Sequence, residues 1–465
     1  MAASGLPPGP VLEFRAGAFG ALTPFVLFLT GVGWLALAGA PDEHGFWPIL
    51  LGALIVGLFL ARDRTAYCDH LIAGMSQPIV MLMIMAWLLA GVIGTLMDAS
   101  GFVDALVWAA RQLDLTGGSY IVAAFLACCL VSTSTGTSFG TILICGPLLY
   151  PAGGPVAANP AMLAGAILAG STFGDSISPI SDTTIASSGT QGADIGGTVR
   201  SRLKYVLPAG AFALVVFALF GTASAIGQAA APAANSPRGL VMLVAPAVVI
   251  ALLLRGRHLV EGLLTGVAVS LVTGLGSGLL TWRQVVYIDA ANFTAKGLVI
   301  DGLTRGLGVS VFTILLIGLV STLKATGLVE RLAGADRASV SGAQGAELRI
   351  FSAVSMAVLL TTHSVVAILT VGELANRLGR LAGLSAYRRA NLLDVTVCTY
   401  PFLLPYFIPP ILASSATSSG EAFGMPRVSP FEAGMYNVYS WALLAIVVVA
   451  MLTGYGRTEG GSGTR

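Results

Sequence analysis

One apolar segment, residues 161–190, limits the possible folds of this chain more than any other. It begins as a helix-forming run and is then interrupted by polar residues and a proline, in the sequence GDSISPISDTT at 174–184. An ionisable group deep in a bilayer costs roughly 3 kcal/mol or more, so such groups usually mark a transport pathway. Proline also lacks the N–H that a continuous helix needs. We therefore expect a discontinuous helix whose unwound middle binds an ion.

Composition indicates that this segment lies in a membrane. Only 10% of the 465 residues are charged and 55% are hydrophobic, whereas soluble domains carry about 25% charged residues. A membrane-spanning helix needs about 20 mostly apolar residues. The candidate spans are 19–39, 46–61, 77–97, 119–150, 161–190, 203–228, 238–254, 258–280, 306–327, 350–377, 386–414 and 435–454. The chain is expected to be an all-α membrane protein, and its lack of a basic patch with interleaved aromatic residues argues against nucleic-acid binding.

Two of these stretches, 119–150 and 350–377, have polar midpoints. The first contains STSTGTS at 132–138, and the second contains TTHS at 361–364. Irregular backbone persists at membrane depth only where it lines a cavity or is buried in protein. We therefore expect both stretches to be re-entrant hairpins with polar tips.

The two halves of the chain resemble each other at one offset of 226 residues. Thr135–Gly146 falls on Thr361–Gly372 without a gap, and five positions are identical. Each half then holds five spans and one hairpin, and an odd number of crossings inverts the second half relative to the first. The sequence predicts inverted repeats at 1–228 and 229–465, with broken helices at 161–190 and 386–414.

The distribution of positive charge supports this topology. Cytoplasmic loops of membrane proteins carry an excess of Lys and Arg. With the N-terminus inside, 18 of the 24 Lys and Arg residues fall in cytoplasmic segments, including the cluster Arg200, Arg202 and Lys204. Both termini are therefore predicted to be cytoplasmic.

Four elements are expected to meet near the membrane midplane: the two hairpin tips and the helix breaks at 174–184 and about 396–405. Na+ prefers oxygen ligands, which carboxylates, hydroxyls and freed backbone carbonyls supply. Asp175 and Asp182 are the predicted Na+ ligands, although either acid could instead bind amides freed by the break. The remaining candidates carry hydroxyl groups: Ser178, Ser181, Thr183, Thr135, Thr137, Ser138, Ser364 and Thr399.

For two residues of the second half, the sequence leaves two interpretations open. Asp394 is an intramembrane acid and so a functional candidate, or it pairs with Arg388 or Arg389. His363 lies at the second hairpin tip, where it can sense pH or remain a neutral, hydrogen-bonded imidazole.

Several of these segments resemble the NhaC-type sodium/proton antiporters, a branch of the ion transporter superfamily. The matching pieces are STSTGTSFGTILICG at 132–146, AGAILAGSTFGDSISPISDTT at 164–184 and LSAYRRANLLDVTVCTYP at 384–401. The resemblance implies exchange of Na+ for H+ across a bacterial inner membrane, by a fold of hairpins and broken helices. The chain departs from the family at Ser176, Ile185 and His363, where many members carry lysine, asparagine and an amide.

The resulting hypothesis is a secondary antiporter that exchanges Na+ for H+ by alternating access, with Asp175 and Asp182 as the shared site and Asp394 assisting. The family also includes exchangers of carboxylic acids such as malate and lactate, so a cation-coupled carrier of small organic acids or amino acids is the alternative. We expect membrane lipid as a partner, a homodimer, and no cofactor beyond the transported ions. Enzymatic activity is not expected, because only one histidine, His363, lies at membrane depth to act with a nucleophile or metal.

Overall fold

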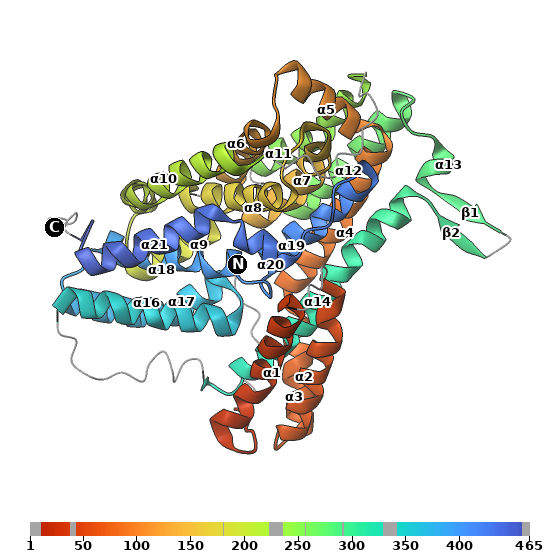
Figure 1. The fold of residues 1–465 in the computed structure, drawn as a ribbon. Helices are drawn as coiled ribbons and strands as arrows, with labels where there is room; N and C mark the ends of the chain where they lie inside the picture. The colour runs from red at the N-terminus through yellow and green to blue at the C-terminus, as the bar shows by residue number, and fades with distance from the viewer. Residues whose placement is uncertain are drawn as a thin grey trace.

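The computed structural model describes residues 11–37, 43–179, 181–222, 236–255, 257–290, 293–328 and 342–457, and they are mostly helical (Figure 1). The first half contains α1 (Gly17–Leu37), η1 (Glu43–Gly45), α2 (Phe46–Leu60), α3 (Arg64–Met75), α4 (Pro78–Ala99), α5 (Phe102–Gln112), α6 (Gly117–Thr135), α7 (Ser138–Leu149), η2 (Pro151–Val156), α8 (Pro160–Ile177), α9 (Asp182–Gln191) and α10 (Ile195–Phe220). The second half contains η3 (Arg238–Leu243), α11 (Val244–Leu254), α12 (Leu259–Gly276), α13 (Trp282–Val285), β1 (Tyr287–Asp289), β2 (Thr294–Lys296), α14 (Leu298–Lys324), α16 (Gly342–Thr361), α17 (Ser364–Leu381), α18 (Ala386–Val397), η4 (Tyr400–Phe402), α19 (Ile408–Ala416), η5 (Thr417–Phe423), α20 (Pro430–Met435) and α21 (Val438–Thr453).

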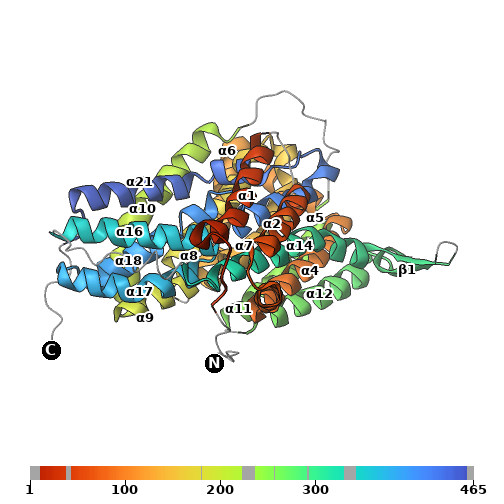
Figure 2. The same ribbon diagram turned by 90° about the horizontal axis from the view of Figure 1, so that it is seen from below.

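Seven of the described helices are long and apolar enough to cross a membrane, which supports the predicted class of all-α membrane protein. They are segments of α1, α4, α6, α10, α12, α14 and α16. The short strands β1 and β2 were not predicted from the sequence. They pair antiparallel and form a hairpin that projects from one end of the molecule (Figure 2).

Helix α10 differs most clearly from the predicted span 203–228. It begins earlier, at Ile195, because the side chain of Asp194 caps it and accepts a hydrogen bond from the Gly197 N–H at 2.6 Å. Hydrogen bonds from the Tyr387 hydroxyl and from Gly197 also lower the pKa of Asp194. The cluster at 200–204, which we assigned to a cytoplasmic segment, therefore lies within the helix.

Some sequence predictions fall on residues outside those that the structure describes. They are the boundary between the two predicted repeats at 228 and 229, Ile180 of the first helix break, and Arg331, Arg337 and Arg465 of the charge distribution.

Glycines allow two helix pairs to approach closely at the centre of the molecule. A Cβ atom on Gly170 of α8 would lie 2.4 Å from the carbonyl oxygen of Phe125 on α6. A Cβ atom on Gly91 of α4 would lie 2.2 Å from the carbonyl oxygen of Gly302 on α14. Small residues commonly permit such contacts between membrane helices, so these glycines fix the spacing of α6 against α8 and of α4 against α14.

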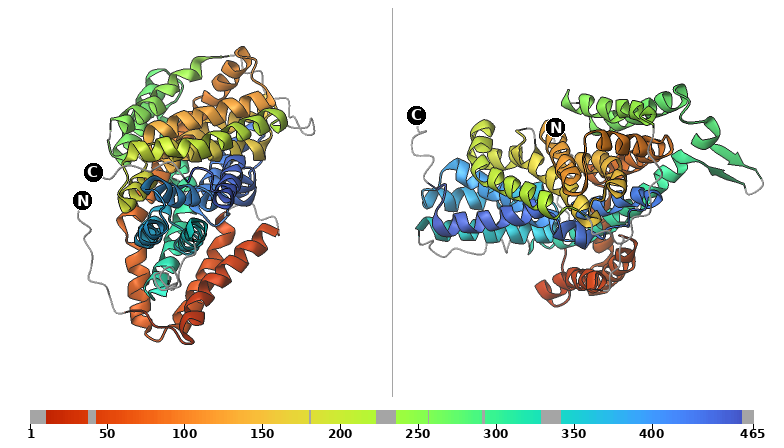
Figure 3. Two further views of the ribbon diagram at one scale, coloured as in Figure 1. Left: turned by 90° about the vertical axis from the view of Figure 1, so that its left-hand side faces the viewer. Right: turned by 45° about the horizontal axis from the view of Figure 1, so that its top comes forward.

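The broken helices lie between two helix pairs. Helices α6 and α7 are joined at Gly136–Thr137, and α16 and α17 are joined at Thr362–His363. Helix α8 packs against α6 and α7, while α9 and α18 pack against α17. The helices α1 and α2 lie on one flank of this arrangement and α11 and α12 on the other (Figure 3). This packing brings the polar ends of α7, α8, α9 and α17 together.

Candidate ion-binding site

The segment predicted as a broken helix is divided into α8 and α9. Helix α8 starts at Pro160 behind its cap Asn159 and ends at Ile177. Ser178 is extended, with φ −77° and ψ 128°, as expected for a residue that precedes a proline. Helix α9 then starts at Asp182. The break frees carbonyl groups at the end of α8 and N–H groups at the start of α9.

Asp175 lies in the last turn of α8 and is only 7% exposed. The hydroxyl of Ser138, at the start of α7, donates a hydrogen bond to its Oδ2 at 3.2 Å. Ser181, from the break itself, lines the same cavity as this carboxylate. The carboxylate thus has hydroxyl oxygens from two elements beside it, which is the type of ligand set that suits a small hard cation.

Asp182 occupies a different environment, although it is only seven positions further along the chain. It lies in the first turn of α9 and its side chain is exposed. The neighbouring hydroxyls of Ser181 and Thr183 hydrogen-bond each other at 3.0 Å. Asp182 is therefore placed to receive a cation from an aqueous space, while Asp175 lies deeper.

The second hairpin tip contributes His363 and Ser364. His363 precedes α17, and within the described part of the chain its buried Nδ1 has no hydrogen-bond partner. The hydrogen-bonded imidazole considered above is thus not what the structure shows at this nitrogen. The hydroxyl of Ser364 donates to the Val397 carbonyl at 3.3 Å, which links this tip to the end of α18.

A cavity of about 150 Å³ collects most of the predicted residues. It is lined by Asp175, Asp182, Ser181, Thr183, Thr137, Ser138, His363 and Ser364. Liquid water occupies about 30 Å³ per molecule, so this cavity has room for about five water molecules. The structure therefore brings together residues from the first helix break and from both hairpin tips.

Four predicted residues do not line this cavity. The hydroxyls of Thr135 and Thr399 donate to the carbonyls of Val131 and Thr396 within their own segments, at 2.9 and 2.7 Å. Ser178 is fully buried in the break. Asp394 also lies apart from the cavity lining and has a partner that we did not predict.

That partner is Arg202 of α10, whose Nη2 lies 2.5 Å from Asp394 Oδ2 with both side chains fully buried. The alternative reading of Asp394, a pair with Arg388 or Arg389, was wrong. Arg388 instead binds Glu347 at 2.8 Å, and Arg389 Nε donates to the Gln191 side chain at 3.1 Å. Those partners occupy both guanidinium groups away from Asp394.

Arg202 also joins the two parts of the broken helix. Its Nη1 donates to the Ser176 carbonyl at 2.7 Å and to the Thr184 hydroxyl at 2.9 Å, and its Nε donates to Asn391 at 3.0 Å. In an unbroken helix the Ser176 carbonyl would accept from a residue four positions later. Arg202 thus satisfies a carbonyl that the break sets free, and it ties α8 and α9 to α18.

The sequence contains a signal that would have located Arg202. The buried positions of α10 include Thr198, Arg202, Tyr205, Ala209 and Ala213, which recur every three to four residues. This spacing defines one face of a helix, so Arg202 falls on the buried face. We instead grouped it with the neighbouring basic residues as cytoplasmic.

The acids of this region do not form a transition-metal type of site. Among the described residues, no three His, Cys, Asp or Glu side chains are grouped closely enough to hold a metal ion together. A monovalent cation bound here would depend on hydroxyl and carbonyl oxygens in addition to the two aspartates.

Comparison with known proteins points to ion transport. Residues 24–222 match the Na+/H+ antiporter family. The Na(+)/H(+) antiporter NhaC of Alkalihalophilus pseudofirmus is 28% identical over 305 residues, which are 62% of this chain and 65% of that protein. The arginine/ornithine antiporter ArcD of Halobacterium salinarum is 28% identical over 325 residues, 65% of this chain and 66% of that protein. The malate-2H(+)/Na(+)-lactate antiporter of Bacillus subtilis is 28% identical over 169 residues, 36% of each chain. The matches thus cover less than two thirds of each relative's length.

Proposed function

Residues 24–222 belong to the Na+/H+ antiporter family, in agreement with the predicted resemblance, and from this premise we propose that the chain is a secondary antiporter that exchanges Na+ for H+ by alternating access. The family consists of transporters rather than enzymes. Na+ and H+ are the transported ions in this proposal, and the protein needs no other cofactor.

The observation that carries the proposal is the buried carboxylate of Asp175 at the end of a broken helix. Desolvation opposes a lone buried negative charge, so the carboxylate needs either a proton or a cation. The Ser138 hydroxyl at 3.2 Å supplies a further oxygen ligand for Na+. Binding of one ion excludes the other, and this competition gives exchange when the site opens to one side of the membrane at a time.

Asp182 has a different role in this mechanism. Because it is exposed and lines the same cavity as Asp175, it attracts cations and completes the Na+ site. Thr137, Ser181 and Thr183 offer further oxygens along the cavity wall. Asp394 assists indirectly, since its ion pair with Arg202 holds the break in place.

We place the exchanger in a bacterial inner membrane with both termini cytoplasmic, as a homodimer in contact with lipid. Its two halves, 1–228 and 229–465, are inverted repeats in this proposal. The helix pairs α6–α7 and α16–α17 are their re-entrant hairpins, and the α8–α9 and α18–α19 segments are their broken helices. The support is the polar turns of both pairs, which meet at one cavity.

An exchanger of small organic acids or amino acids is a second candidate. A further cavity of about 410 Å³, lined by Asp182, His363 and Lys324, is larger than Na+ requires. Two of the relatives are named for organic substrates, malate and lactate in one case and arginine and ornithine in the other. A carboxylate substrate would find a cationic group in Lys324 and a hydrogen-bonding group in His363.

Inside-out membrane vesicles with an internal pH-sensitive dye test the proposal. Addition of Na+ should move protons in vesicles that contain the wild type or the control variant Asp301→Asn, an exposed acid of α14. Asp175→Asn should abolish the response. If Na+ moves no protons above background across the physiological pH range, the Na+/H+ proposal fails, and a response to malate, lactate or arginine in the same vesicles would favour the second candidate.

A further inference from the structure

Three cavities follow one another along the face of α4. The large cavity is lined by Val80 and Met83, the central cavity by Met83 and Trp87, and a small recess by Trp87 and Gly94. These positions recur every three to seven residues and so lie on one side of the helix. Among the residues of α4, Met83 lines both the large and the central cavity, and Trp87 lines both the central cavity and the recess.

Helix α14 relates the series of three cavities to the two surfaces of the membrane. Its Lys324 lines the large cavity and its Arg305 lines the small recess. The 19 residues between these positions span about 29 Å at 1.5 Å per residue, which is close to the bilayer's hydrocarbon thickness of about 30 Å. The two outer cavities thus lie near opposite membrane surfaces, with Asp175 in the central cavity between them.

The volumes of the three cavities decrease from the Lys324 side to the Arg305 side. Their volumes are about 410 Å³ on the Lys324 side, about 150 Å³ at the centre and about 50 Å³ on the Arg305 side. The last has room for only one or two water molecules at about 30 Å³ each. Four residues line both of the larger cavities, the polar Asp182 and His363 and the apolar Met83 and Val365, so polar groups form part of the boundary between them.

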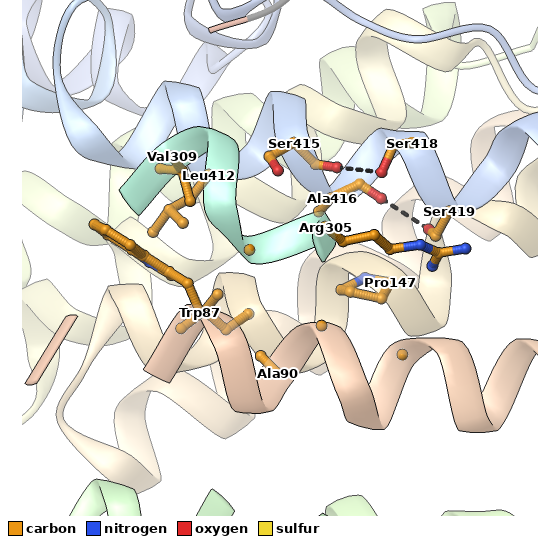
Figure 4. A pocket seen from close by; sticks show the side chains of 14 residues that line it. Trp87, Ala90, Pro147, Arg305, Val309, Leu412, Ser415, Ala416, Ser418 and Ser419 are labelled. Carbon is orange, nitrogen blue, oxygen red and sulfur yellow. Dashed lines mark hydrogen bonds between the residues drawn. The ribbon is translucent and has the colours of Figure 1, made fainter. Parts of the chain in front are cut away.

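The connection on the other side is made by apolar groups. Trp87 and Leu143 are the residues that line both the central cavity and the recess. Trp87 is 3% exposed. Figure 4 shows its ring at one end of the recess and the Arg305 guanidinium at the other. Arg305 is itself fixed by an ion pair with Asp98 at 2.9 Å.

We propose that Trp87, with Leu143, is the gate that closes the ion site toward the Arg305 side, and that this conformation is open toward the Lys324 side. An apolar pair at the narrow end excludes water and hydrated cations, whereas the wide end offers Asp182 to the aqueous phase. The inference rests on the proposed exchange function, because alternating access requires one closed side at a time.

Cysteine labelling tests the gate without using transport activity. The reporter is Phe139→Cys, which lines the central cavity, in a protein whose exposed Cys68 and cavity-lining Cys398 are both replaced by serine. A membrane-impermeant methanethiosulfonate reagent is added either to intact cells, which present the Arg305 side, or to inside-out vesicles, which present the Lys324 side. Since a minor conformation is at most about a tenth of the population, the reporter should react about tenfold or more faster in vesicles.

Substitution of the gate should remove this asymmetry. Trp87→Ala should raise the labelling rate in cells by about tenfold, and Leu143→Ala should raise it in the same direction. Trp34→Ala, an exposed tryptophan of α1, is the control and should change neither rate. If Trp87→Ala does not fold, Leu143→Ala and Trp87→Phe give the same comparison.

Two results would overturn the gate. One is equal labelling from both sides while Trp87 is intact, and the other is an unchanged rate in cells for folded Trp87→Ala and Leu143→Ala. A failure of Na+ to move protons in the vesicle assay would instead refute the exchange function. The labelling pattern would then still report whether Trp87 closes the cavity.

Discussion

Asp175 and Asp182 are only seven positions apart, but their different surroundings give them different roles. Asp175 is 7% exposed and has the Ser138 hydroxyl at 3.2 Å, while Asp182 is exposed on the cavity surface. Because an unpaired charge is costly in a buried position, the Asp175 carboxylate must bind either a proton or a cation. Because Asp182 is exposed, its carboxylate stays charged in water and attracts cations.

The first prediction concerns Ser138. Ser138→Ala removes a hydroxyl beside the carboxylate, and a hydrogen bond to a charged group contributes about 1.5–3 kcal/mol, so the apparent Na+ affinity should fall by roughly tenfold or more. The measurement is Na+-dependent proton movement in vesicles as a function of Na+ concentration. Thr135→Ala is the matched control, because its hydroxyl donates to Val131 within the same helix. Equal effects of the two variants would contradict the assignment.

A second prediction concerns the pair of Arg202 and Asp394. Removing one partner of a buried ion pair leaves an uncompensated charge and costs about 3–5 kcal/mol. Arg202→Ala should therefore lower the thermal unfolding temperature of the purified protein strongly, and Arg202→Lys should recover only part of the loss because a lysine cannot reach four acceptors in the same geometry. Arg427→Ala, at an exposed pair with Glu421, is the control and should leave the temperature unchanged. A small effect of Arg202→Ala would show that the pair does not hold the break.

At the scale of elements, the spacing of α6 against α8 determines where the break is held. Gly170→Ala would place a methyl group 2.4 Å from the Phe125 carbonyl oxygen and 2.7 Å from Cys128 Cβ, so α8 must shift. Such overpacking typically costs about 1–3 kcal/mol. The expected result is a lower unfolding temperature together with weaker Na+-driven proton movement.

The matched control is Gly189→Ala in α9, where an added methyl group meets nothing within 4 Å. Alanine has the higher helix propensity, by up to about 1 kcal/mol, so this variant should be as stable as the wild type or slightly more so. If both alanine variants behave alike, the close contact between α6 and α8 is not what positions Asp175.

The helices also show which features of the fold could be predicted from the sequence. The interruption near Pro179 was predictable because proline and clustered hydroxyls act locally on a helix. The start of α10 and the partner of Asp394 were not predicted, since the first depended on recognising a cap at Asp194 and the second joins residues 192 positions apart. The short helices α3 and α5 were also missed, because neither has the length of a membrane span. Features that depend on local sequence could thus be predicted, whereas contacts between helices distant in the sequence could be identified only in the folded structure.

At the scale of the whole molecule, the proposed topology makes a prediction about sidedness. Phe293, beside the strand β2, is 96% exposed, and Lys296 of β2 is one of the six basic residues that the charge distribution predicts to lie outside. Phe293→Cys should react with an impermeant maleimide in intact cells, and the native exposed Cys68 of α3 should react only after the membrane is opened. Labelling of Cys68 in intact cells, or protection of the cysteine at 293, would contradict the orientation.

In the proposed exchange, Na+ and H+ compete for the buried carboxylate of Asp175. Calorimetric titration of the purified protein with Na+, in two buffers of different ionisation enthalpy, measures the protons released on binding. Because a ligand must be deprotonated before a cation binds it, we predict release of up to about one proton per Na+ at acidic to neutral pH, declining as pH rises. Asp175→Asn should abolish this release. Na+ binding without proton release at any pH, or an unchanged release in Asp175→Asn, would contradict the account.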